Sequence, residues 1–318
     1  MNPSDLDPLR EHLASRIIGQ QKFIDSMLIC LLSDGHLLVE GLPGLAKTTA
    51  VKALAEGIEA DFHRVQFTPD LLPSDLIGTD IYRHEKGEFE FRQGPIFHNI
   101  LLGDEINRAP AKVQSALLEA MAEHQITVGQ TTYALPQLFM VLATQNPIEQ
   151  EGTYQLPEAQ LDRFLMQANV EYPSREEELQ ILALDSSQMT TPPKPPSKQL
   201  SQHDLFAIRQ EAAALYLDPK LNNYIVDLVQ ATRNPKAYDA DLARWCRFGA
   251  SPRASIALAR CSRVRAWLDG EDFVAPHHIQ AVAPPILRHR ILLTFEAEAE
   301  GITTDDFLAR LLDMVAIP

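Results

Sequence analysis

The stretch Gly41-Leu42-Pro43-Gly44-Leu45-Ala46-Lys47-Thr48 decides the fold of this chain. A short apolar run precedes it at residues 36–40 and predicts a strand, and the alanine-rich residues 48–57 predict a helix after it. A turn between a strand and a helix can curl backbone N–H groups around a phosphate at the helix N-terminus. Lys47 is placed to reach the β- and γ-phosphates of a nucleotide, and the Thr48 hydroxyl is placed to bind magnesium. Together with Thr49, the stretch therefore predicts a phosphate-binding loop.

One position departs from the usual loop pattern, because Ala46 stands where glycine commonly precedes the lysine. Alanine serves there if its backbone keeps a negative φ, whereas a positive φ carries a steric cost. The alternative interpretation is a Gly/Pro turn before an ordinary helix. The order of strand, turn and helix favours the phosphate loop.

A second motif follows at Gly103-Asp104-Glu105, directly after the apolar residues 100–102. Asp104 is placed to hold magnesium through water, and Glu105 is placed to polarise the attacking water as a general base. Carboxylates after a strand also commonly cap the next helix. The phosphate loop upstream favours the catalytic interpretation.

Apolar runs alternating with helical stretches predict an α/β fold with a mostly parallel sheet that helices cover on both faces. Residues 81–91 and 126–135 break this alternation, and each predicts a hairpin. The predicted strands lie at residues 36–40, 64–67, 100–102, 139–143 and 164–170, with a helix at 111–123.

A proline-rich segment divides the chain, since Pro192, Pro193, Pro195 and Pro196 exclude a helix or a central strand. We expect an αβα nucleotide-binding core at 1–185, an extended linker at 186–200 and a helical lid domain at 201–318. Helical patterns in the last part cover residues 204–214, 220–232, 253–268 and 275–283.

Three further polar residues are candidates for the site, each with a plainer alternative. Asn146 follows a predicted central strand and could orient water or the γ-phosphate, or it could form a turn with Pro147. Arg163 could stabilise a transferring phosphoryl group, or it could be a cation at a helix C-terminus. Arg253 begins a helix and could reach the phosphates across a cleft, or it could be a solvated arginine.

The composition of the chain limits the classes of function that fit it. The formal net charge is -15 and the pI is about 5.1, which argues against broad binding of nucleic acid. Three widely spaced cysteines, a polar N-terminus and the lack of a long apolar run predict a cytoplasmic protein without a membrane span. The pair His277-His278 has no obvious acidic or cysteine partner set, so metal binding there is not expected. The arginines at positions 260, 263 and 265 predict a solvated helix face.

Taken together, these motifs resemble the AAA+ superfamily, and more closely its MoxR family, over nearly the whole chain. In that family alanine is common before the loop lysine. Besides the phosphate loop, the matching stretches are Ile18-Gly19-Gln20, Phe67-Thr68-Pro69-Asp70-Leu71-Leu72-Pro73-Ser74-Asp75, Gly103-Asp104-Glu105-Ile106-Asn107-Arg108-Ala109, Ala143-Thr144-Gln145-Asn146-Pro147, Leu156-Pro157-Glu158-Ala159-Gln160-Leu161-Asp162-Arg163-Phe164 and Ser251-Pro252-Arg253-Ala254.

The resemblance implies roles for individual residues. Asn146 would be sensor 1, Arg163 an arginine finger that acts on a neighbouring subunit, and Arg253 sensor 2 on the lid. Ile17 and Ile18 would lie near the adenine. The resemblance also implies a helix-2 insert at about 79–95 and a pre-sensor-1 hairpin at about 124–138.

The resemblance further implies a chaperone-like remodelling ATPase that uses ATP/ADP and Mg²⁺ and is assembled as a hexameric ring. Its clients would be separate proteins that it matures or activates, including proteins with a von Willebrand factor A domain. The alternatives are a nucleic-acid-stimulated motor, a metal-chelatase-type motor subunit, or a nucleotide-dependent binding module without turnover. The carboxylate Glu105 argues against the last.

Overall fold

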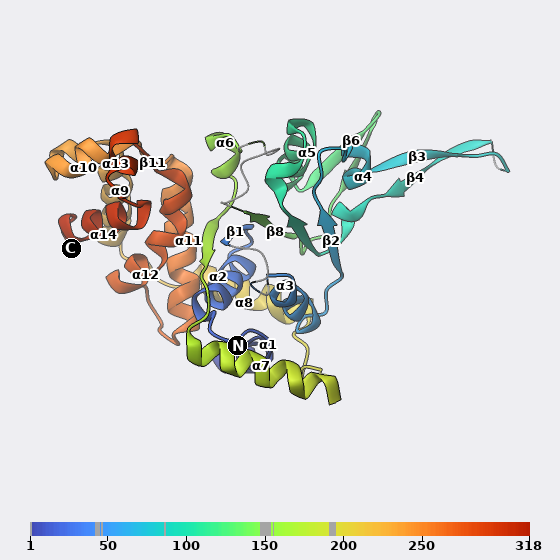
Figure 1. Cartoon of the computed structure of the whole chain (residues 1–318), viewed down its shortest axis with the longest axis horizontal. Coiled ribbons are helices and arrows are strands. Elements are labelled where there is room, and N and C mark those ends of the chain that lie inside the picture. Colours follow the sequence, from blue (N-terminus) through green and yellow to red (C-terminus); the bar gives the residue numbers. More distant parts are fainter. Residues whose placement is uncertain are drawn as a thin grey trace.

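The structure is a computed structural model, and it describes residues 2–41, 45, 47–85, 87–146, 154, 156–190 and 195–318. In this part of the chain, a parallel sheet lies between layers of helices, and a helical bundle lies at one side of it (Figure 1). The predicted α/β core with a C-terminal helical part is confirmed.

Among the described residues, five strands form the sheet in the order β2-β5-β8-β1-β9, and each neighbouring pair is parallel. Each predicted apolar run contributes one of these strands. Their bounds are β1 (Leu37–Gly41), β2 (Phe62–Gln66), β5 (Ile100–Asp104), β8 (Met140–Gln145) and β9 (Met166–Val170).

The central strands are apolar up to their carboxyl ends because both of their faces are buried. Leu101 and Val141 pack into one hydrophobic cluster, while the adjacent residues Leu102 and Leu142 pack into another on the opposite face. Successive side chains of a strand point to opposite faces of the sheet. In a strand that is covered on both faces, side chains of both orientations are therefore buried and apolar. This explains the continuous apolar runs in the sequence.

The helices of the core cover these two faces. On one face, α2 and α3 bury Met27, Leu31 and Leu54, and on the other α5 buries Val113 and Leu117. The helices up to β9 are α1 (Asp7–Arg16), α2 (Gln21–Leu32), α3 (Lys47–Glu56), α4 (Pro73–Ile77), α5 (Ala111–Glu123) and α6 (Glu158–Leu161), with 3-10 helices at Pro3–Leu6, Pro95–Phe97 and Ile106–Arg108.

Both predicted hairpins are present. The longer one projects far from the body of the molecule (Figure 1), and its exposed tip region carries Phe89 and Tyr82. Phe91 stacks on Tyr133 of the shorter hairpin, with ring centroids 4.2 Å apart. The strands are β3 (Gly78–Arg83) with β4 (Glu88–Gln93), and β6 (Gln125–Val128) with β7 (Thr131–Ala134).

The prediction of an extended segment from residue 186 is wrong at its start, because helix α7 covers Arg175–Thr190. The prolines that exclude a helix begin only at Pro192, and a proline disfavours helical backbone at the residue before it. Residues 191–194 lie outside the described part. Leu200 at the end of the segment forms a bridge to Ile58 beside α3.

Helix α8 (Gln202–Ala214) ties the core to the bundle, since it packs against both α2 and α11. Arg209 on α8 donates to the Leu31 carbonyl at 2.7 and 2.9 Å and pairs with Asp34 at 2.7 Å. The division of the chain at residues 185 and 201 stays a prediction. The bundle consists of α9 (Pro219–Arg233), α10 (Ala240–Trp245), α11 (Pro252–Leu268), α12 (Pro276–Leu287), α13 (Phe295–Ala299) and α14 (Thr304–Met314), with β10 (Cys246–Phe248), β11 (Leu292–Leu293) and 3-10 helices at Pro235–Ala237 and Arg288–Arg290.

Across the described residues, no helix combines the length and the apolar character that crossing a bilayer requires.

Candidate functional site

A cavity of about 410 Å³ lies at the carboxyl edge of the sheet. The parallel strands β2, β5 and β8 end there together, with Gln66 beside Asp104 and Gly103 beside Ala143. This is the edge at which open α/β sheets bind ligands. The lining residues are Leu45, Lys47, Thr48, Thr49, Arg64, Gln66, Asp104, Glu105, Thr144 and Asn146.

The cavity therefore brings together most of the described residues of the two sequence motifs. Gly41 closes β1 next to it. Leu42, Pro43, Gly44 and Ala46 of the predicted phosphate loop lie outside the described residues.

Lys47 begins α3, and its Nζ donates a hydrogen bond to the Gly41 carbonyl at 2.6 Å. Burial lowers the pKa of Lys47, while the negative charges of Asp104, Glu105 and Glu40 oppose this shift. The ammonium group therefore lies between the backbone of its own loop and the carboxylates of the site, where it can bind a phosphate anion.

Asp104, at the end of β5, has a donor on each carboxylate oxygen. Thr144 donates its hydroxyl to Oδ1 at 2.6 Å, and Arg64 donates to Oδ2 from Nη2 at 2.6 Å and from Nε at 3.2 Å. The carboxylate of Asp104 and the hydroxyl of Thr48 face the same cavity. Hard oxygen donors of this kind fit magnesium.

Glu105 leaves the strand with a positive φ of 57°. For a residue other than glycine, such a backbone conformation must be held by its surroundings. Here the Glu105 N–H donates to the Thr144 hydroxyl at 2.9 Å, while Oε2 accepts from Gln66 Nε2 at 2.9 Å and pairs with Arg108 Nε at 3.0 Å. The turn directs the carboxylate of Glu105 into the cavity beside Asp104.

Asn146 is buried and lines the cavity from the end of β8. Its partner in the alternative turn, Pro147, lies outside the described residues.

Arg163 and Arg253 lie in a different place. Both line a second cavity of about 330 Å³ that also contains Arg260 and Arg290. Arg163 donates to the Leu118 carbonyl at 2.5 Å, and Arg253 lies 3.6 Å from Asp162. Neither arginine is among the described residues that line the first cavity, so the structure separates them from Lys47 and Asp104 of the same chain.

The described lining of the first cavity comes from the core alone, between Leu45 and Asn146. No described residue of the lid contributes to it. Ile17 is buried in the hydrophobic core and Ile18 is half-buried; both follow α1, and neither is among the described residues that line this cavity.

Sequence reasoning missed Arg64, Gln66 and Thr144. The available signal was polar residues near the ends of predicted strands, namely Arg64 and Gln66 at alternate positions in one run and Thr144 directly after another. That signal becomes specific only once the strand order is known, because the order places β2 and β8 on either side of β5.

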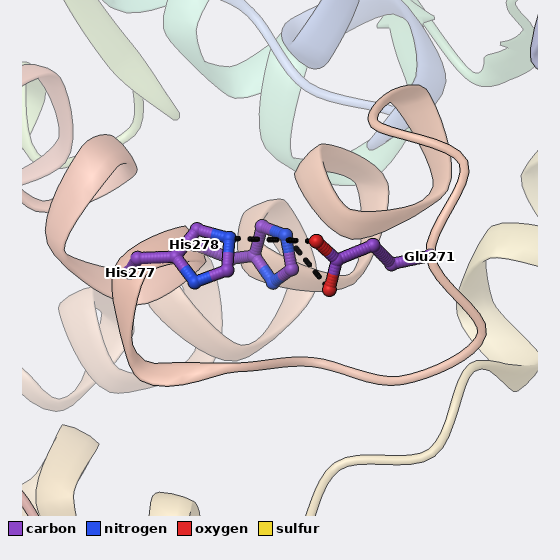
Figure 2. A group of neighbouring side chains, drawn as sticks. All are labelled: Glu271, His277 and His278. Atoms are coloured by element: carbon purple, nitrogen blue, oxygen red, sulfur yellow. Dashed lines mark ion pairs between the residues drawn. The ribbon is translucent and has the colours of Figure 1, made fainter.

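The expectation that His277 and His278 have no acidic partner is wrong, as Figure 2 shows. Glu271 lies 3.7 Å from Nε2 of His277 and 3.8 Å from Nε2 of His278. However, the backbone N–H of Ala275 donates to Nδ1 of His278 at 2.9 Å. In the neutral ring the proton is therefore on Nε2, the atom that faces Glu271, whereas a metal ligand needs a lone pair there. This arrangement favours a histidine that caps α12.

The five-stranded order, the lysine at the start of α3 and the acidic pair at the end of β5 define a P-loop ATPase of the AAA+ class. The family model for the ATPase family associated with various cellular activities (AAA) matches residues 36–166, and the model for the AAA lid domain matches residues 243–311.

Similar proteins cover nearly the whole chain. Chaperone MoxR1 of Mycobacterium tuberculosis is 48% identical over 95% of this chain and 79% of its own length. The uncharacterized protein YeaC of Bacillus subtilis is 43% identical over 99% of this chain and 96% of its own. The crystal structure of a Cytophaga hutchinsonii protein assigned as an ATPase has a TM-score of 0.91 at 46% identity, covering 99% of this chain and 96% of that one. The chain belongs to the MoxR family of AAA+ ATPases.

Proposed function

We propose that this ATPase is a chaperone-like machine that binds Mg-ATP in the cavity of Lys47, Thr48 and Asp104 and uses hydrolysis to remodel partner protein complexes. The observation that carries the proposal is that Lys47, Asp104, Glu105 and Asn146 face one cavity at the carboxyl edge of the sheet. The chaperone description of the Mycobacterium tuberculosis relative supports the remodelling part.

Each residue has a distinct task in this proposal. Lys47 binds the β- and γ-phosphates, Glu105 orients and deprotonates the attacking water, and Asn146 positions that water against the γ-phosphate. Thr48 and Asp104 hold magnesium, which supplies charge neutralisation for the phosphates when it is bound. Ile17 and Ile18 lie on the adenine side, and the lid closes over the nucleotide.

We also propose that the protein works as a hexameric ring, in which Arg163 completes the site of a neighbouring subunit, while Arg253 acts as sensor 2 on the lid. The placement of Arg163 outside the cavity of its own chain supports this arrangement. An arginine supplied by a neighbour stabilises the charge on the transferring phosphoryl group.

The clients in this proposal are separate cytoplasmic proteins, including proteins with a von Willebrand factor A domain. All three cysteines lie in the described part of the chain and are free thiols, as a reducing compartment favours. The acidic net charge of -15 supports protein clients over nucleic acid.

Nucleotide binding by a Lys47→Ala protein tests the proposed site. We expect its Kd for a fluorescent ADP analogue to rise roughly 10- to 100-fold, since a charge-assisted contact to phosphate contributes about 1.5–3 kcal/mol. Lys52→Ala is the matched control, because Lys52 lies on the same helix with its side chain exposed. Equal affinity in the Lys47→Ala and Lys52→Ala proteins would exclude the cavity as the phosphate site.

A further inference from the structure

Arg64 is the middle residue of the edge strand β2, and its side chain reaches the acidic pair of the site. Its guanidinium contacts Oδ2 of Asp104 through two nitrogens, at 2.6 Å from Nη2 and 3.2 Å from Nε. The Asp104 side chain is only 16% exposed, so its charge is poorly neutralised by solvent. Arg64 is therefore a direct counter-ion of Asp104, in addition to the nearby charge of Lys47.

The contact of Arg64 extends to the second acidic residue. Nη2 of Arg64 also donates to Oε1 of Gln66 at 3.1 Å, and Nε2 of Gln66 donates to Oε2 of Glu105 at 2.9 Å. A continuous chain of hydrogen bonds thus joins Asp104 to Glu105 through two residues of β2. The ion pairing of Asp104 is in this way connected to the position of Glu105, the proposed general base.

An arginine and a divalent cation cannot share this carboxylate without cost. Oδ1 of Asp104 already accepts the Thr144 hydroxyl, and Oδ2 accepts Arg64. Two cations held a few ångströms apart in a partly buried site repel each other by on the order of 1 kcal/mol or more. A magnesium ion held by Asp104, directly or through water, therefore competes with the Arg64 ion pair.

We infer that Arg64 is a built-in counter-ion of Asp104, which pairs with the carboxylate when no metal is bound and is released when magnesium and nucleotide bind together. This inference rests on the proposed function and assigns to that site a positioning residue that opposes metal binding. Without metal, Arg64 reduces the repulsion between Asp104 and phosphate. The release of Arg64 also frees Gln66 to change its hydrogen bond to Glu105.

The coupling between metal and nucleotide tests this role. For a fluorescent ADP analogue, the ratio of the Kd in excess EDTA to the Kd in excess Mg²⁺ measures that coupling directly. In an Arg64→Gln protein, Asp104 has lost the arginine charge and repels metal-free ADP more strongly, so the first Kd rises. The competitor for magnesium is also gone, so the second Kd falls or stays the same. We expect the ratio to rise about tenfold, which corresponds to 1.4 kcal/mol.

Two further variants show whether the effect comes from charge. Arg64→Lys keeps the cation, and its ratio should stay within about twofold of the wild type. Arg83→Gln is the matched control, because the Arg83 side chain is similarly exposed and forms an ion pair with Glu90 on the projecting hairpin, away from the site; its ratio should not change. A purely structural role for Arg64 would weaken both affinities equally and leave the ratio unchanged.

The outcomes separate the inference from the proposed function. Normal nucleotide binding with an unchanged or lower ratio in Arg64→Gln would overturn the counter-ion role alone. If the wild-type protein bound no nucleotide with or without Mg²⁺, the proposed function would fail, and the role of Arg64 with it. A rise in the ratio for Arg64→Gln but not for Arg64→Lys would support the role.

Discussion

At the scale of single residues, Thr144 organises the acidic pair. Its hydroxyl donates to Asp104 and accepts from the backbone N–H of Glu105, so one side chain sets both the carboxylate of one residue and the backbone turn of the next. Thr144 is almost fully buried. The positive φ of Glu105 therefore depends on a contact with the neighbouring strand and not on residues close in sequence.

His36, at the start of β1, gives the core a titratable group. Its Nδ1 accepts from the Val141 N–H at 3.0 Å, and its Nε2 lies 3.2 Å from the Met121 carbonyl, so the neutral ring satisfies both neighbours. Burial lowers the pKa of His36 from 6.5 to about 4. Between these two pH values the unfolded chain binds a proton that the folded chain does not.

The resulting pH dependence has a definite sign. The contribution of His36 to the free energy of unfolding is complete above about pH 6.5 and is lost as the pH falls toward about 4, by roughly 3 kcal/mol in total. Urea unfolding across this range checks it. The slope of the free energy of unfolding against pH should correspond to about one proton fewer in His36→Gln. It should be unchanged in His203→Gln, where the histidine is exposed. An equal slope in His36→Gln and the wild type would contradict the assignment.

Motif chemistry makes some site residues predictable and leaves others out. Lys47, Thr48, Asp104 and Glu105 follow from local sequence, because a loop, a helix N-terminus and a strand end each place their own residues. Arg64 acts on a residue of another strand, and only the parallel register of β2 with β5 brings the two together. A pattern in one segment carries no information on that register.

At the scale of elements, the buried strands were predictable and α7 was not. The strands are continuous apolar runs because helices cover both faces. Helix α7 has no buried residue between Arg175 and Ser187, and Leu179 and Leu182 on it are exposed. A helix without a buried face leaves no 3.6-residue periodicity in the sequence, so the nearby prolines dominated the prediction.

The two hairpins were predictable as elements, but their contact was not. Phe91 on β4 and Tyr133 on β7 stack with an interplanar angle of 20°. We expect a double-mutant cycle with Phe91→Leu and Tyr133→Leu to give a coupling energy of about 0.5–1.5 kcal/mol in thermal or urea unfolding. The pair Phe89 and Tyr133, which the structure does not join, serves as the control cycle. A coupling energy near zero for Phe91 and Tyr133 would show that the stacking does not hold the hairpins together.

At the scale of the whole molecule, the fold places the proposed phosphate-binding residues and the proposed arginine finger of one chain in different cavities. Lys47 and Glu105 face one cavity, whereas Arg163 faces another that Arg253 also lines. In a ring, the arginine side of one subunit can meet the nucleotide side of the next. The fold of each subunit was predictable from the sequence, but this separation depends on packing between core and lid.

Mixing two inactive proteins tests the assembly. Arg163→Ala lacks the arginine but keeps the general base, and Glu105→Gln has the opposite defect. If Arg163 acts on the neighbouring subunit, a mixed ring contains interfaces with both groups intact, and ATP turnover should recover to a fraction of the wild-type rate. Fluorescence energy transfer between labelled subunits verifies that mixed rings form. No recovery at any ratio in verified mixed rings would place Arg163 outside the site.

The central claim is that ATP is hydrolysed in the cavity that Lys47 and Asn146 line, with Glu105 as the general base. Comparing Glu105→Gln with Glu119→Gln tests this claim most directly. Glu119 is an exposed residue on α5 and serves as the control. We predict that Glu105→Gln binds ATP with unchanged affinity but hydrolyses it at least about 100-fold more slowly in single turnover, as expected for loss of a general base, while Glu119→Gln behaves like the wild type. Equal single-turnover rates in the two variants would contradict the account.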